Sequence, residues 1–138
     1  MGKEKRPFTT LFLIESLDGK ISTGDNNELD IDKDFPILPG IRDGLYQYYE
    51  LERKTDLVSF NSGKVQAKVG VNQSDLAHVE KTPVTFVLVD NKPHLDENGC
   101  SYFALRSNTF YLVTHNKNHP VFRLKERYDN IEILYFRV

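Results

Sequence analysis

The sequence is short of several features, and each shortage excludes a class of protein. Cys100 is the single cysteine among 138 residues, so no disulfide framework forms within the chain, as is usual in the reducing cytosol. The apolar run LFLI (residues 11 to 14) is too short for a signal peptide or a membrane span. The net charge of −2 gives no reason to expect nucleic acid or an anionic membrane as a partner. We therefore expect a single cytoplasmic domain without such partners.

The chain does contain apolar runs that alternate with segments of helical spacing. Ile41, Leu45 and Tyr48 lie on one face of an amphipathic helix predicted at residues 41 to 54. Short β-branched and aromatic runs predict strands at residues 9–14, 56–60, 84–90, 109–114 and 131–136. Further helices are predicted at residues 98–106 and 119–128. This alternation predicts an α/β fold with a mostly parallel sheet and helices on both faces.

The last predicted strand stands at the end of the given chain, with no helix after it to cover its apolar side chains. We therefore expect the domain to be incomplete at its C-terminus. A strand with an unpaired edge presents backbone donors and acceptors with which a second chain can pair. We expect the chain by itself either to aggregate or to pair with a second copy as a homodimer.

The first predicted strand leads directly into the segment ESLDGKISTG (residues 15 to 24). Asp18-Gly19 fits a hairpin turn, because Gly tolerates positive φ and Asp hydrogen-bonds to its own backbone. The segment also follows the carboxyl end of a strand, where open α/β sheets bind ligands. Asp18 and the hydroxyl groups of Ser22 and Thr23 would then face a polar ligand. The residues alone leave both interpretations open.

A second polar turn, Asn61-Ser62-Gly63-Lys64, follows the strand predicted at residues 56 to 60. Gly63 allows a ligand to approach the backbone closely, and the N–H groups of a short following helix favour phosphate. Lys64 adds a positive charge at the same end. If the first two strands are neighbours, the two turns together suit a nucleotide or another phosphorylated ligand.

Other motifs lack residues that their chemistry requires. In the segment SGKV, Val65 stands where a P-loop has Ser or Thr, and the upstream glycine is missing, which excludes a nucleoside-triphosphate site of that type. His115 and His119 are four residues apart, but Pro120 argues against a helix that would align them. No metal site is therefore expected there.

The order of these motifs resembles that of a known family. The matching segments are SLDGKIST (16–23), TDLVSFNSGKVQAK (55–68), PVTFVLVDNK (83–92) and FYLVTHNKNHP (110–120). They are similar to consecutive parts of the reductase domain of riboflavin biosynthesis, which has the dihydrofolate-reductase-like fold. The resemblance implies an NADPH-dependent reductase that transfers a hydride to a small, phosphorylated, pyrimidine- or pteridine-like substrate.

The resemblance also implies roles for particular residues. Asp18 would be the catalytic carboxylate, which stabilises positive charge on the carbon that accepts the hydride or orients a sugar hydroxyl. Ser16, Ser22 and Thr23 would bind the substrate together with Asp18. The residues along the NADPH dinucleotide would be Asn61, Gly63, Lys64, Asp90 and Asn91.

The turn at residues 61 to 64 supports a second interpretation as well. The family usually has Gly-x-Gly-Thr at this turn, whereas this chain has the side chains of Asn61 and Lys64 there. A non-catalytic nucleotide-binding or interaction domain could keep the fold without being competent to bind the cofactor. The sequence leaves the reductase and this alternative open.

Overall fold

The computed structural model describes residues 6, 8–11, 17, 37, 39–55 and 57–138. The chain divides into two compact units, residues 1–48 and 49–138, and each is considered by itself. The described part of the first unit includes Gly40, whose φ of 83° suits glycine, immediately before helix α2 (Ile41–Thr55). The predicted helix at residues 41 to 54 is therefore confirmed.

The strand predicted at residues 9 to 14 is only partly within the described residues. Thr9, Thr10 and Leu11 belong to no strand in the structure. The other three positions of that strand lie outside the described residues.

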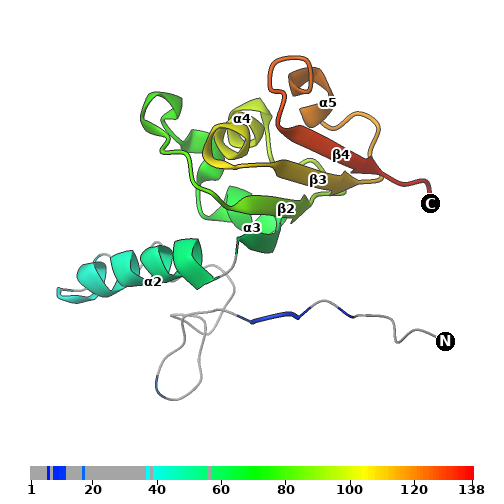
Figure 1. Cartoon of the computed structure of the whole chain (residues 1–138). Coiled ribbons are helices and arrows are strands. Elements are labelled where there is room, and N and C mark those ends of the chain that lie inside the picture. Colours follow the sequence, from blue (N-terminus) through cyan, green and yellow to red (C-terminus); the bar gives the residue numbers. More distant parts are fainter. Residues whose placement is uncertain (1–5, 7, 12–16, 18–36, 38, 56) are drawn as a thin grey trace. The chain divides into compact units, whose positions relative to one another are not determined.

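The second unit is built on a four-stranded sheet. Its strands are β1 (Val58–Ser62), β2 (Thr85–Val89), β3 (Phe110–Thr114) and β4 (Ile131–Tyr135). All three neighbouring pairs are parallel and the spatial order is β1-β2-β3-β4, as the aligned arrowheads of β2, β3 and β4 illustrate (Figure 1). The predicted α/β class and parallel sheet are confirmed.

Short helices connect the strands of this unit. They are α3 (Gly63–Lys68), the 3₁₀ turns η2 (Val71–Gln73) and η3 (Leu76–His78), α4 (Glu97–Arg106) and α5 (Val121–Leu124). The helix predicted at residues 98 to 106 is confirmed as α4. Asp96 caps α4 by accepting a hydrogen bond from the N–H of Gly99 at 2.9 Å.

The helix predicted at residues 119 to 128 is wrong in length, because only Val121–Leu124 is helical. Val121 and Leu124 are both fully buried, whereas the three residues that follow are exposed. After Leu124, the next apolar side chain that could continue the buried face of the helix is that of Tyr128. The chain turns instead, with the N–H of Tyr128 bonded to the Leu124 carbonyl at 3.1 Å, and enters β4.

The helices α3, α4 and α5 share one face of the sheet. Each new strand is added on the same side of the strand before it, in the order β1-β2-β3-β4. Because crossovers between parallel strands are right-handed, the helices of all three crossovers then lie on the same face of the sheet. The hydrophobic core between the sheet and these helices contains side chains from both layers, including Phe86, Leu88, Cys100, Phe103, Phe110, Leu112, Val121, Leu124 and Ile131. On the other face Phe60 is 73% exposed and Leu134 is 52% exposed. Helices on both faces therefore remain a prediction.

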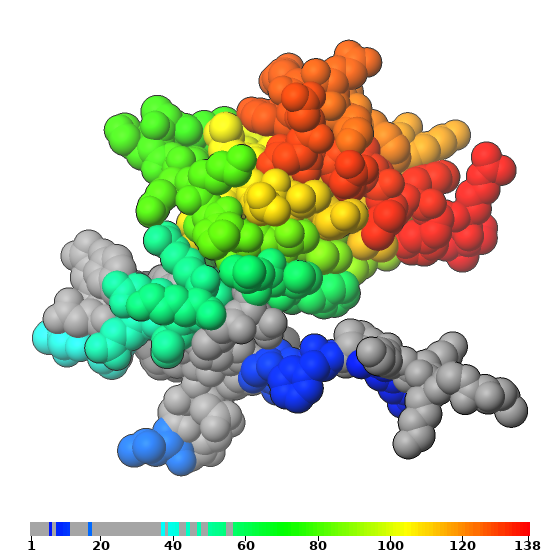
Figure 2. Space-filling view, in the orientation of Figure 1, coloured from blue at the N-terminus to red at the C-terminus, as the bar shows by residue number. Residues whose placement is uncertain are grey.

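Phe103 of α4 lies at the centre of this core. Its ring centroid is 5.4 Å from that of Phe86 and 5.5 Å from that of Phe110, which joins α4 to both central strands. In the space-filling view the atoms of α4 (yellow) lie between those of the preceding 3₁₀ turns (green) and those of α5 (orange) (Figure 2). The central strands and the loops at their ends are thus backed by a packed layer.

Cys100 is a fully buried member of this layer. Burial raises the pKa of its thiol strongly, and the negative charges of Asp90, Asp96 and Glu97 raise it further. Because the thiolate is the reactive form, we expect the native protein to react with a disulfide reagent at least about a hundredfold more slowly than the unfolded chain. The measurement is the rate of colour release from such a reagent, with and without guanidinium chloride. Equal rates would contradict the buried position of Cys100.

Candidate functional site

The carboxyl ends of β1, β2 and β3 meet at one edge of the sheet, because the strands are parallel and in register. Ser62 at the end of β1 pairs with Val89, and Val89 pairs with Val113 of β3. The segments that follow these three strands therefore start side by side. We call residues 61–64, where β1 runs directly into α3, together with the loops at residues 90–96 and 114–120, the carboxyl edge.

Gly63 is in direct contact with Asp90 across this edge. A Cβ atom added to Gly63 would lie 2.4 Å from Cγ of Asp90 and 2.6 Å from its Oδ2, which is closer than real Cβ contacts. Only a residue without a side chain fits here without displacing the carboxylate. Two residues that the sequence assigned to one ligand from separate motifs are thus neighbours in the structure.

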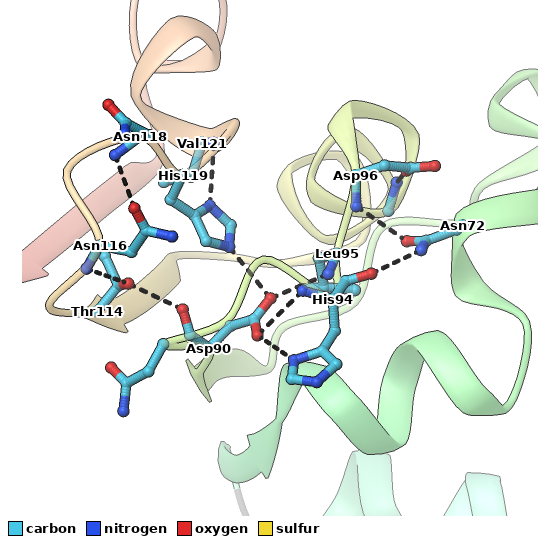
Figure 3. A network of polar contacts seen from close by, with 12 residues as sticks. Asn72, Asp90, His94, Leu95, Asp96, Thr114, Asn116, Asn118, His119 and Val121 are labelled. Atoms are coloured by element: carbon cyan, nitrogen blue, oxygen red, sulfur yellow. Dashed lines mark hydrogen bonds and ion pairs between the residues drawn. The ribbon is translucent and has the colours of Figure 1, made fainter.

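The Asp90 side chain is buried and holds the centre of a polar network (Figure 3). Its Oδ1 accepts hydrogen bonds from the ring Nδ1 of His94 at 2.8 Å and from the His94 N–H at 3.3 Å. Its Oδ2 accepts from the Leu95 N–H at 2.9 Å and from Nε2 of His119 at 3.1 Å. A carboxylate accepts about four hydrogen bonds, so that of Asp90 has its full number of partners.

These partners keep the Asp90 carboxylate ionised although it is buried. Burial by itself raises the pKa of the Asp90 carboxyl. Hydrogen bonds from His119, Leu95 and His94 together outweigh burial and hold the pKa below its ordinary value. Asp90 is therefore a fixed negative charge that organises the loops around it.

His119 is fully buried, and its hydrogen bonds define its protonation state. Its Nδ1 accepts a hydrogen bond from the N–H of Val121 at 3.2 Å, so this nitrogen carries no proton. The proton is on Nε2, which donates it to Asp90. His119 is thus a neutral imidazole that attaches the start of α5 to the end of β2.

His94 is held by the same carboxylate but is partly open to solvent. Its side chain is 34% exposed, and Nδ1 donates to Asp90. Its carbonyl accepts a hydrogen bond from the side-chain amide of Asn72 at 2.8 Å, and its N–H is close to the Lys92 carbonyl at 2.6 Å. Among the residues that the structure describes, nothing is bonded to Nε2 of His94.

The loops after β2 and β3 are joined directly by hydrogen bonds. The hydroxyl of Thr114 donates to the Asp90 carbonyl at 2.8 Å, and the N–H of His115 donates to Oδ1 of Asn91 at 3.1 Å. The Thr114 hydroxyl also accepts from the N–H of Asn116 at 3.1 Å. The carboxyl edge is therefore preorganised by its own side chains.

The exposed charges of the carboxyl edge are largely positive. Lys64, Lys92 and Lys117 follow the ends of β1, β2 and β3 and are all exposed. Within the described ranges none of the three lysines has an ion-pair partner. The exposed carboxylate in these loops is that of Asp96, which is hydrogen-bonded at the start of α4. The surface therefore favours an anionic ligand over a cation.

The structure brings together all the residues that the sequence assigned to the dinucleotide. Asn61, which is half-buried, accepts a hydrogen bond from the N–H of Ser62 at 3.1 Å through its side chain. Gly63 contacts Asp90, and Lys64 and Asn91 adjoin these two residues in the chain. The residues assigned to catalysis and substrate lie outside the described residues: Ser16, Asp18, Ser22 and Thr23.

His94 and His119 are part of the site, and the sequence motifs did not indicate either of them. One signal was present for His94. Asp90 directly follows a buried strand, where a carboxylate requires donors, and His94 is one of three side-chain donors in the four residues that follow, with Asn91 and Lys92. No comparable signal existed for His119, which lies after another strand.

Comparison with protein-family models, curated proteins and solved structures found no match. Among the helices that the structure describes, none has the length and apolar character needed to span a bilayer.

Proposed function

We propose that this chain is an NADPH-dependent reductase domain of the dihydrofolate-reductase-like class, with the dinucleotide bound at the carboxyl edge. The observation that carries the proposal is the contact of Gly63 with Asp90. It joins the loops after β1 and β2 into one surface beyond the carboxyl ends of parallel strands. Ligands of open α/β sheets bind at such positions.

The chemistry of the surface fits a dinucleotide. The exposed ammonium groups of Lys64 and Lys92 match the negative charges of its phosphates. Gly63 is buried, and its missing side chain leaves room for the Asp90 carboxylate rather than for a ligand, contrary to the expectation from the sequence. Asn61 and Asn91 offer amide groups for hydrogen bonds to ribose or base. Asp90 contributes indirectly, because its carboxylate has its full number of hydrogen bonds and fixes the loop that carries Lys92.

When bound, NADPH supplies the hydride, and the protein orients the ring and excludes water. In this proposal Asp18 lies on the substrate side, where a carboxylate stabilises positive charge at the carbon that is reduced. The substrate is a small, phosphorylated, pyrimidine- or pteridine-like molecule, and Ser16, Ser22 and Thr23 contact it. A cytoplasmic location and a homodimer complete the proposal.

A non-catalytic nucleotide-binding or interaction domain is the second candidate. Its support is the turn after β1, where Asn61 places a half-buried side chain and Lys64 an exposed one next to Gly63. In this case the carboxyl edge would bind a phosphorylated ligand or a partner without hydride transfer.

The test is a titration of the full-length protein with NADPH and with NADH, followed by nicotinamide fluorescence. We expect saturable binding, weakened about fivefold by Lys64→Ala through loss of a charged contact. The matched control is Lys81→Ala, since Lys81 is exposed but precedes β2, toward the opposite edge of the sheet. No saturable binding of either dinucleotide would remove the reductase proposal. Equal effects of the two substitutions would remove the carboxyl edge as the binding surface.

A further inference from the structure

His94 combines a fixed position with a ring nitrogen that has no described partner. Its Nδ1 donates to Asp90 at 2.8 Å, and Asn72 holds its carbonyl at 2.8 Å. The ring is therefore oriented from within the protein, and Nε2 is the nitrogen left for an outside ligand. In Figure 3 the ring of His94 projects away from the side of Asp90 on which His119 lies.

The environment of His94 differs from that of the other histidine bonded to Asp90. Both nitrogens of His119 are used inside the protein, and its side chain is fully buried. His94 uses one nitrogen, and 34% of its side chain is exposed. The same carboxylate thus fixes one imidazole for structure and presents the other at the surface.

When a carboxylate is hydrogen-bonded to one nitrogen of an imidazole, the other nitrogen is the one that can contact a ligand. Because Nδ1 donates to Asp90, Nε2 is the nitrogen left for a ligand, and it donates a hydrogen bond when the ring carries both protons. The exposed charges nearest to His94 in its own loop are those of Lys92 and Asp96, each two residues away, and Lys64 follows the glycine packed against Asp90. Two of these three charges are positive, and the carboxylate of Asp96 is hydrogen-bonded at the start of α4. An anion with several acceptor oxygens matches this set of donors.

We infer that His94 is a ligand-binding residue that acts as a doubly protonated ring: Nδ1–H stays on Asp90, and Nε2–H donates a hydrogen bond to a phosphate group of the ligand, together with the charges of Lys64 and Lys92. The inference rests on the proposed function, from which it takes a phosphorylated ligand. It goes beyond that function by naming a residue that contacts the phosphate. It also gives the Asp90 network a role, which is to hold the His94 ring in position for this contact. Asp90 and Asn72 are positioning residues for this contact.

The experiment compares the full-length protein with His94→Ala and His115→Ala. His115 is an exposed histidine of the same carboxyl edge, and its ring lies against the ring of Phe136, with 5.7 Å between their centroids. Calorimetry measures the affinity for NADPH, NADH and inorganic pyrophosphate. We expect His94→Ala to weaken NADPH and pyrophosphate binding about tenfold or more, as for loss of a charge-assisted hydrogen bond, and His115→Ala to have little effect.

A second measurement keeps the inference testable if a variant folds poorly. In the wild-type protein, the ¹⁵N signal of the His94 Nε2 should shift when inorganic pyrophosphate is added, while the Nδ1 signal should move less. This readout follows the contact itself and does not depend on activity or on a substitution.

The outcomes separate the inference from the proposed function. If NADPH binds and neither His94→Ala nor the ¹⁵N signal shows involvement of His94, the inference is overturned and the reductase proposal stands. If pyrophosphate binds through His94 but neither dinucleotide binds, the phosphate site stands and the reductase proposal falls. If the wild-type protein binds none of the three, both are overturned.

Discussion

Replacement of Gly63 by alanine is expected to lower the free energy of unfolding by about 3 kcal/mol, the upper part of the usual range for an overpacked interior. The new Cβ would lie 2.4 Å from Cγ of Asp90 and 2.6 Å from its Cβ, so the whole side chain would have to move. Asp90 cannot move freely, because His94, Leu95 and His119 hold its carboxylate. The clash therefore spreads into the hydrogen bonds of the carboxyl edge.

The measurement is chemical unfolding followed by far-ultraviolet circular dichroism. Gly44→Ala is the matched control, since no atom lies within 4 Å of a Cβ placed at Gly44 in helix α2. There we expect a stabilisation of up to about 1 kcal/mol from helix propensity. A Gly63→Ala protein as stable as the wild type would show that Gly63 and Asp90 are not packed as described. The same substitution should also reduce phosphate binding, because it displaces the residue that orients His94.

Replacement of Asp90 by alanine is expected to cost about 3–5 kcal/mol of stability at neutral pH, since each buried donor that loses its acceptor costs about 1–3 kcal/mol. The change would leave the Nε2–H of His119 and the N–H of Leu95 buried without acceptors. Asp75→Ala is the control, because Asp75 makes a similar bond to His78 at 2.7 Å, but on the surface. In that exposed pair we expect little change in the unfolding midpoint.

The difference between the wild type and Asp90→Ala should depend on pH. The pKa of the Asp90 carboxyl is lowered in the folded protein, whereas an unfolded aspartate has a pKa of about 3.9. A lowered pKa stabilises the folded state fully above the unfolded value and loses that contribution as the pH falls through the folded value. We therefore expect a constant difference between about pH 7 and 5 that narrows below about pH 4. A difference that grows at acid pH would contradict the ionised state of Asp90.

The strands of the second unit could be predicted closely from the sequence, because each is a short β-branched and aromatic run. The strand predicted at residues 84 to 90 is Thr85–Val89, and that at 109 to 114 is Phe110–Thr114. The strand predicted at 56 to 60 begins and ends two residues later, at Val58–Ser62, because Asn61 and Ser62 pair with β2 as well. Asn61 and Ser62 were predicted to form a turn because their side chains are polar, although their backbone belongs to the strand.

The site was harder to predict, because it depends on which loops become neighbours. Gly63 and Asp90 were both assigned to the ligand, yet their contact follows from the pairing of β1 with β2. His119 reaches Asp90 because β3 lies next to β2, so that two loops separated by a helix and a strand meet. The spacing of His115 and His119 contains no information about that partner. Local sequence patterns indicate elements, whereas this network is a property of the assembled sheet.

The order of the strands in the sheet is also their order along the chain. Val58 pairs with Thr85, Phe86 with Phe110, and Phe110 with Ile131, so β2, β3 and β4 each dock on the described strand synthesised just before. Each step closes a loop of similar, modest length, and the entropy lost in closing a loop rises only slowly with its length. These four strands can consequently be added one at a time as the polypeptide leaves the ribosome, and none of the four has to be inserted later between two that are already paired.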